Sequence, residues 1–165
     1  MRNLSSLIAM LVLFVTPISS ARNIELWSYD ALFKSADLVV IGTAQGTVDN
    51  GARFPENRWA GALTGEQTTF VIERALQGKP PGGALKVNHF RYTKDAILTD
   101  GPLLVSFRTK PIILAEPPNG HISLGTPQYL LFLKATSDGS WEPVSGQADA
   151  QLSVKEIYCP LPDLD

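Results

Sequence analysis

Apolar residues recur at helical spacing in one short segment near the start of the chain. Four of them are three or four positions apart, as on one face of a helix: Leu26, Tyr29, Phe33 and Ala36. Ser28 can cap this helix, and Asp30 places a negative charge in its first turn, where the helix dipole favours it. The pattern predicts one short helix within residues 26–36, with Trp27, Tyr29 and Phe33 on the face that docks on the domain.

After the helix the pattern changes to strand character. The first strand is expected from residue 38 to residue 48; it begins with an unbroken apolar run and contains Gly42 and Gly46. Glycine inside a strand marks a bulge or a sharp bend. We therefore expect one long, curved strand that serves two sides of a barrel.

Further short strands follow, most of them bounded by glycine and proline. They are expected at residues 68–76, 85–92, 103–107, 112–115, 122–124, 129–133 and 141–144. Turn residues at 78–83, 117–120 and 138–139 separate neighbouring strands, and the last two turns predict hairpins. Residues 152–157 fit either a strand or a short helix. This succession predicts an all-β sandwich or a small barrel.

Three stretches of the sequence carry a resemblance to a known family. They are Ala36 to Thr43, Phe70 to Gly78, and Tyr129 to Leu133 followed by Asp138 and Gly139. In order and pattern, residues 36–146 resemble secreted OB-fold domains of the tissue inhibitor of metalloproteinases and netrin-like superfamily. The resemblance implies a small OB-like antiparallel barrel with one short N-terminal helix. In that family an N-terminal Cys-x-Cys reaches the protease zinc. This chain has no cysteine at the corresponding place, so inhibition by that route is not expected.

The first 21 residues have the pattern of a secretory signal peptide. Arg2 supplies a positive charge, residues 7–15 form an apolar run, and Pro17 ends that run before a few small residues. Cleavage is expected after Ala21, with cleavage after Ser20 as the alternative. A membrane span needs about 20 apolar residues, so no stable membrane anchor is expected. The mature chain, residues 22–165, is expected to be a single domain exported to a periplasm or to the extracellular space.

Charge and cysteine content narrow the classes of partner. The chain has 14 Lys and Arg against 16 Asp and Glu, a net charge of −2, with basic residues scattered singly among acidic ones. Nucleic-acid binding needs a basic face because phosphate contacts dominate its affinity, so no nucleic-acid partner is expected. Cys159 is the only cysteine and cannot close an intrachain disulfide. We interpret it as a half-buried structural residue, with an intermolecular disulfide as the alternative.

Sequence patterns for catalysis and metal binding are missing. The two histidines, His89 and His121, stand in no HExxH, HxxxH or Cys-paired zinc pattern. We expect His89 on the barrel surface and His121 in a turn. No GxSxG motif occurs, and the glycine-rich stretch 78–83 lacks the GK[ST] ending of a phosphate loop. No cofactor, metal or catalytic residue is therefore predicted.

One segment has the composition of a binding loop. Arg53, Phe54, Arg58 and Trp59 lie within seven residues of segment 49–66, which is expected to be a long loop. Arginine and tryptophan are enriched where partners bind, and in an OB-like barrel this loop joins the first two strands, at a usual ligand edge. The alternative is that Phe54 and Trp59 fold back to close a barrel end while the arginines stay solvated.

Three hypotheses for function follow. The first is an exported, non-enzymatic binding module that holds a protein partner through Arg53, Phe54, Arg58 and Trp59. The second is a small secreted hydrolase or metal-dependent enzyme that uses His89 or His121 with acidic residues brought close by folding. The third is a structural protein that dimerises through Cys159.

Overall fold

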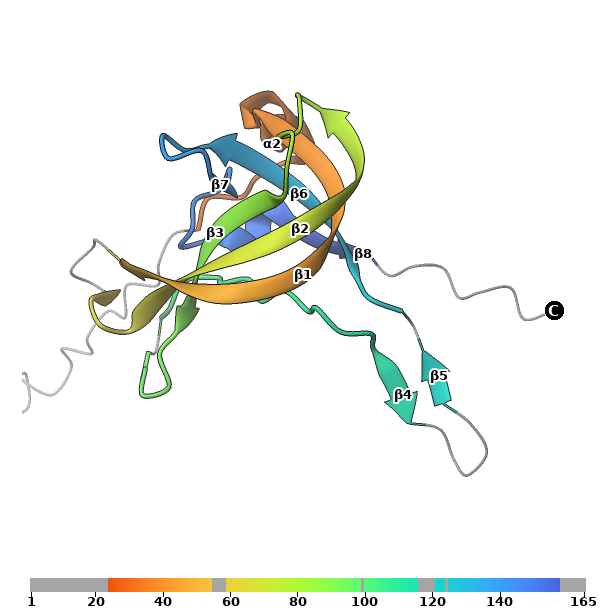
Figure 1. The fold of residues 1–165 in the computed structure, drawn as a ribbon. Coiled ribbons are helices and arrows are strands. Elements are labelled where there is room, and N and C mark those ends of the chain that lie inside the picture. The colour runs from red at the N-terminus through yellow and green to blue at the C-terminus, as the bar shows by residue number, and fades with distance from the viewer. Residues whose placement is uncertain (1–23, 55–58, 99, 116–120, 124, 158–165) are drawn as a thin grey trace, which may run out of the picture.

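The structure, a computed structural model, describes residues 24–54, 59–98, 100–115, 121–123 and 125–157 (Figure 1). Its elements are α2 (Tyr29–Ser35), β1 (Leu38–Arg53), β2 (Leu63–Gln77), β3 (Leu85–Tyr92), β4 (Ile113–Ala115), β5 (His121–Ser123), β6 (Gln128–Ala135), β7 (Trp141–Pro143), the 3-10 helix η3 (Ala150–Ser153) and β8 (Val154–Ile157). The predicted signal peptide and Cys159 lie outside these ranges. No helix within these ranges is long and apolar enough to cross a bilayer.

Five strands close into a small barrel of the OB type. Around the ring the neighbours are β1, β2, β3, β7 and β6, and β6 pairs with β1 to close it. All of these pairings are antiparallel except that of β3 with β7. β8 pairs with residues 128–131 of β6, next to the part of β6 that pairs with β7. The predicted all-β, OB-like barrel with one short N-terminal helix is therefore confirmed.

β1 serves two sides of the barrel, as its glycines predict. Residues 38–43 pair with β6 on one edge, while the strand pairs with β2 along its other edge. The register with β2 shifts between Ile41 and Gly42 and again before Gly46, which are the irregularities that bend a strand. At Gly42 a Cβ atom would lie 2.7 Å from the carbonyl oxygen of Val71. Only glycine fits this close approach.

The seam between β3 and β7 is held by few contacts, because only Val87 and Trp141 pair across it. Asn88 Nδ2 donates a 2.6 Å hydrogen bond to Ser140 Oγ, which joins β3 to the turn between β6 and β7. The Asp138 carboxylate accepts hydrogen bonds from the hydroxyl of Ser140, the hydroxyl of Thr136 and the backbone N–H of Ser140, and these bonds lower the pKa of Asp138 to about 2. The hairpin predicted here is confirmed, and its side chains help to close the barrel.

The strand predicted over residues 103–107 is wrong. Within the described ranges this segment pairs with no strand; its side chains Val105 and Phe107 are buried in the barrel core instead. The Phe107 ring meets Phe70 and Tyr129 edge-on, with ring centroids 4.8 and 5.1 Å away. Buried and exposed residues alternate here as they would in a strand. Val105 and Phe107 are buried because the segment fills the interior of the barrel, not because it forms a strand of the barrel wall.

The predicted helix is confirmed, and its apolar face is in part the one expected. Ser28 caps α2 by accepting a hydrogen bond from the Ala31 N–H. Leu32 is the buried anchor of the helix and belongs to a cluster with Val39 and Phe132. Leu26 lies before the helix and is 88% exposed. Trp27 and Phe33 pack against the cluster as predicted, and Tyr29 is 57% exposed with its ring centroid 6.0 Å from that of Phe132.

The loop predicted over residues 49–66 is shorter than expected. β1 continues to Arg53 and β2 begins at Leu63, so only residues 54–62 connect them. The side chains of Asp49 and Asn50 accept hydrogen bonds from backbone N–H groups two residues further on. These turns produce an irregularity in the ladder, which resumes where Arg53 pairs with Thr64. The polar, glycine-containing stretch therefore bends the strand without ending it.

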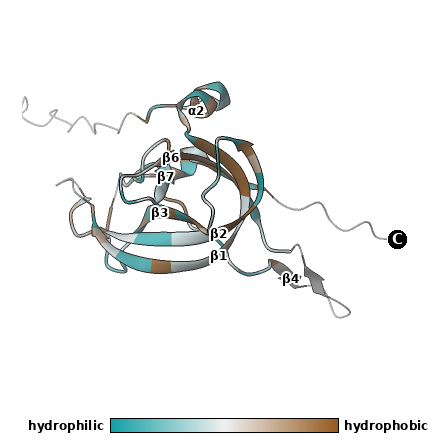
Figure 2. Cartoon of the chain, turned by 45° about the horizontal axis from the view of Figure 1, so that its top comes forward, coloured by the Kyte–Doolittle hydropathy of each residue, from teal (hydrophilic) through white to brown (hydrophobic). Residues whose placement is uncertain are grey.

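Two further predictions concern the second half of the chain. A hairpin was expected at 112–124, and β4 and β5 form one that projects away from the barrel (Figure 1). At the end of the chain both alternatives occur, because η3 is followed directly by β8. Figure 2 shows hydrophobic stretches of β1 and β6 near α2, with hydrophilic bands on the parts of β1 and β2 farther from the helix.

Candidate functional site

The aromatic residues of the predicted binding loop belong to a buried cluster. Trp59 is 5% exposed and packs with Leu63 and Phe90. Phe54 is half-buried beside them, with its ring centroid 5.3 Å from Trp59 and 5.1 Å from Phe90. This arrangement agrees with the alternative in which the two aromatics fold back onto the barrel. They therefore present no exposed aromatic anchor to a partner.

The structure describes only one of the two arginines of that loop. Arg53 ends β1 with an exposed side chain, and Arg58 lies outside the described residues. Partner binding through Arg53 and Arg58 stays a prediction.

His89 lies inside the barrel, and its predicted surface position is wrong. It is 1% exposed. It shares the inward face of β3 with Leu85 and Val87, because the three residues occupy every second position of the strand. Its Nε2 is 2.8 Å from the hydroxyl of Thr68, and its ring centroid is 5.0 Å from that of Phe107. Burial lowers the pKa of His89 to about 4. The imidazole is therefore neutral at pH 7 and fills space in the core.

The nearest carboxylate to this imidazole is already paired. Glu66 Oε2 lies 3.8 Å from His89 Nδ1, which is buried without a hydrogen-bond partner. Glu66 Oε1 accepts a 2.7 Å hydrogen bond from Arg91 Nε, and Arg91 Nη2 also lies 3.9 Å from an oxygen of Asp49. The guanidinium thus pairs closely with Glu66 and more loosely with Asp49.

The structure does not bring the two histidines together. His89 belongs to the barrel, whereas His121 begins β5 in the separate two-stranded sheet (Figure 1). In the part of the chain that the structure describes, no group of three His, Cys, Asp or Glu residues could hold a metal ion. The enzyme hypothesis therefore gains no support from the positions of its proposed residues.

A surface pocket lies where the barrel-filling segment leaves the barrel. Its volume is about 360 Å³, and it is lined by six consecutive residues: Phe107, Arg108, Thr109, Lys110, Pro111 and Ile112. The backbone N–H of Arg108 donates a 2.8 Å hydrogen bond to the hydroxyl of Tyr129, and that of Ile112 donates a 3.0 Å bond to the Gly125 carbonyl. Both ends of the segment are thereby held. We call residues 107–112 the cationic pocket.

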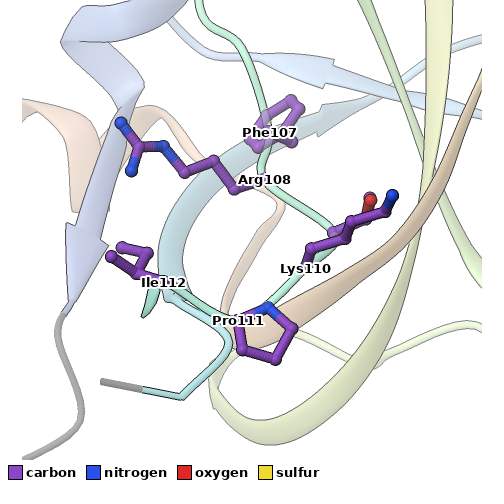
Figure 3. Close-up of a pocket in the computed structure, with 6 residues that line it drawn as sticks. Phe107, Arg108, Lys110, Pro111 and Ile112 are labelled. Carbon is purple, nitrogen blue, oxygen red and sulfur yellow. The ribbon is translucent and has the colours of Figure 1, made fainter. Parts of the chain in front are cut away.

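Two unpaired cations flank the apolar centre of the cationic pocket. Arg108 and Lys110 are exposed, and neither forms an ion pair within the described part of the chain. In Figure 3 their side chains extend to opposite sides, with Pro111 and Ile112 between and below them. Such a site can take up an apolar group at its centre and carboxylates at its rim.

Sequence reasoning missed the cationic pocket although a signal was present. Residues 101–115 contain no Asp or Glu, so Arg108 and Lys110 have no acidic neighbour in the chain. The interpretation of residues 103–107 as a strand hid this signal, because it placed the segment in the barrel wall.

Comparisons with known proteins identify no relative of this chain. No family model matches the chain, and neither a curated protein nor a solved structure matches it.

Proposed function

We propose that this protein is an exported binding module that holds an acidic protein partner at the cationic pocket. The observation that carries the proposal is a pair of cations, Arg108 and Lys110, that form no ion pair with the described residues and lie on either side of an apolar surface held by the barrel. The leader-like residues 1–21 support export.

The chemistry of the pocket suits a protein surface that combines carboxylate and apolar groups. An arginine guanidinium can bind a carboxylate through two parallel hydrogen bonds, and arginine is enriched at the energetic centres of interfaces. A stable interface buries about 800 Å² on each partner, which is more than six residues offer. The β4–β5 hairpin continues directly from Ile112 and can supply additional area.

The proposal is tested with charge-reversal variants of equal net charge. The purified protein, its Arg108→Glu/Lys110→Glu variant and a Lys86→Glu/Lys94→Glu control are immobilised and exposed to the native exported fraction. Lys86 and Lys94 are exposed and lie outside the pocket. A protein retained by the wild type and the control is then purified, and its affinity for all three is measured.

We expect the pocket variant to bind at least about tenfold more weakly than the control, with a difference that shrinks as salt is added. Equal affinity of the two double variants for the retained partner would contradict the proposed site.

A further inference from the structure

The second half of β2 is paired along one edge only. β3 pairs with β2 from Leu63 to Phe70, whereas residues 71–77 pair with β1 alone. An unpaired strand edge presents its outward N–H and carbonyl groups to whatever lies beside it. We call residues 71–77 the open edge of β2.

The chain segment that returns along this edge does not pair with it. Residues 78–84 run from β2 to β3, and no backbone hydrogen bond joins them to β2 in the described structure. Pro80 and Pro81 have no N–H to donate, and Gly82 and Gly83 have no side chains to fill the space. The sequence of this segment thereby keeps a gap beside the strand.

The gap is a groove with apolar walls. It has a volume of about 580 Å³ and is lined by Phe70, Val71 and Ile72 of β2, Gln45 of β1 and residues 80–84. Val71 is 43% exposed and Leu76, farther along the open edge, is 45% exposed. An extended peptide can therefore bury apolar side chains here while its backbone pairs with the strand.

The open edge of β1 differs in character from that of β2. Beyond Thr43, β1 pairs only with β2, and half of its residues are polar or charged. Its register shifts twice, and the side chain of Asn50 donates to the Glu66 carbonyl and accepts from the Ala52 N–H. Charges and bulges are devices that discourage strand addition. The open edge of β2 lacks this polar covering around Val71 and Ile72.

Positive charge flanks the groove. Arg74 lies on the open edge and Lys79 begins the return segment; both are exposed, and neither forms an ion pair within the described residues. Glu73, by contrast, accepts a 3.1 Å hydrogen bond from the Thr43 hydroxyl. A strand added at this edge therefore meets two cations that have no carboxylate partner among the described residues, and one carboxylate, Glu73, that is held by the Thr43 hydroxyl.

We propose that the open edge of β2 binds an extended segment of a protein partner as an additional strand. The segment carries apolar side chains at alternate positions and acidic side chains that face Arg74 and Lys79. Six paired residues would span about 20 Å at 3.3 Å per residue. This binding mode does not depend on the cationic pocket, so evidence against one of the two sites leaves the other proposal intact.

The test uses a defined probe, an acetylated and amidated nine-residue peptide of alternating valine and glutamate. Amide hydrogen exchange of the wild-type protein is measured by NMR with and without the peptide. We expect exchange at outward amides of residues 71–76 to slow at least tenfold. A peptide with alternate backbone N-methyl groups should give no protection, and one with lysine in place of glutamate should bind more weakly.

Two variants of one glycine separate groove binding from damage to the fold. A Cβ atom at Gly82 would meet no atom within 4 Å, so substitution there leaves the barrel undisturbed. We expect Gly82→Phe to fill the groove and abolish protection, whereas Gly82→Ala retains it.

Several results would overturn the proposal. They are unchanged exchange at residues 71–76 with millimolar peptide, equal binding of the lysine peptide, or equal protection in Gly82→Phe. Protection of these residues that depends on protein concentration without peptide would assign the edge to a second copy of this chain instead.

Discussion

Acidification should destabilise the barrel through one buried side chain, His89. The imidazole is 1% exposed, its Nδ1 has no hydrogen-bond partner, and burial lowers its folded-state pKa from 6.5 to about 4. Below pH 6.5 the unfolded chain takes up a proton at this position before the folded protein does. The stability contributed by the neutral imidazole is therefore complete above pH 6.5 and is lost as the pH falls toward 4.

The size of the effect follows from the two pKa values. Each pKa unit corresponds to about 1.4 kcal/mol, so lowering the pKa from 6.5 to about 4 corresponds to roughly 3 kcal/mol of unfolding free energy. The charged group nearest the imidazole is the Glu66 carboxylate, 3.8 Å from Nδ1, and its pairing with Arg91 limits how far it can stabilise an imidazolium. The loss is a large part of the stability of a small domain.

The assay compares the wild type with His89→Gln, whose amide can still bond to the Thr68 hydroxyl. Urea unfolding is followed by tryptophan fluorescence at pH values from 4 to 7.5, and the free energy is extrapolated to water at each pH. Ionisable groups far from residue 89 are common to both proteins, so their contributions cancel in the difference. We expect the wild type to lose about 3 kcal/mol more than the variant over this range. Parallel pH profiles would refute the reasoning.

Three further predictions concern packing and closure of the barrel. Trp59→Ala should lower the unfolding free energy by about 3–5 kcal/mol, whereas Arg53→Ala should change it by less than about 0.5 kcal/mol; urea unfolding distinguishes the two. Gly42→Ala should cost about 1–3 kcal/mol, because its Cβ would press on the Val71 carbonyl, and a melting temperature equal to the wild type's would contradict this. Asn88→Ala should cost about 1–2 kcal/mol and speed amide exchange in β7, since it removes the bond across the seam; unchanged exchange there would count against that role.

The sequence predicted those elements whose pattern depends on local contacts. The α2 cap at Ser28, the β3 strand and the hairpins were predictable because capping, alternation and turn chemistry act over a few residues. The bend of β1 was predictable from its glycines for the same reason. Closure of five strands into a ring follows from this curvature.

Other features depend on contacts between distant segments and were not predictable. Residues 103–107 alternate like a strand, but Phe107 is buried by the barrel interior rather than by a sheet neighbour. His89 occupies the next inward position of β3 after Leu85 and Val87. Because its side chain is polar, the sequence pattern favoured a surface position instead. The absence of acidic residues from 101–115 hinted at unpaired cations, but the pocket itself and the lack of ion pairs of Arg108 and Lys110 with the described residues follow only from the folded chain.

Photo-crosslinking from inside the cationic pocket tests the central claim most directly. A p-benzoylphenylalanine is placed at Thr109, which lines the pocket, and at Lys94 as the exposed control. Each protein is irradiated in the native exported fraction at low and high salt. We predict one discrete protein adduct from position 109 that disappears at high salt and is missing from position 94. The same adducts from both positions, or none from position 109 at low salt, would contradict it.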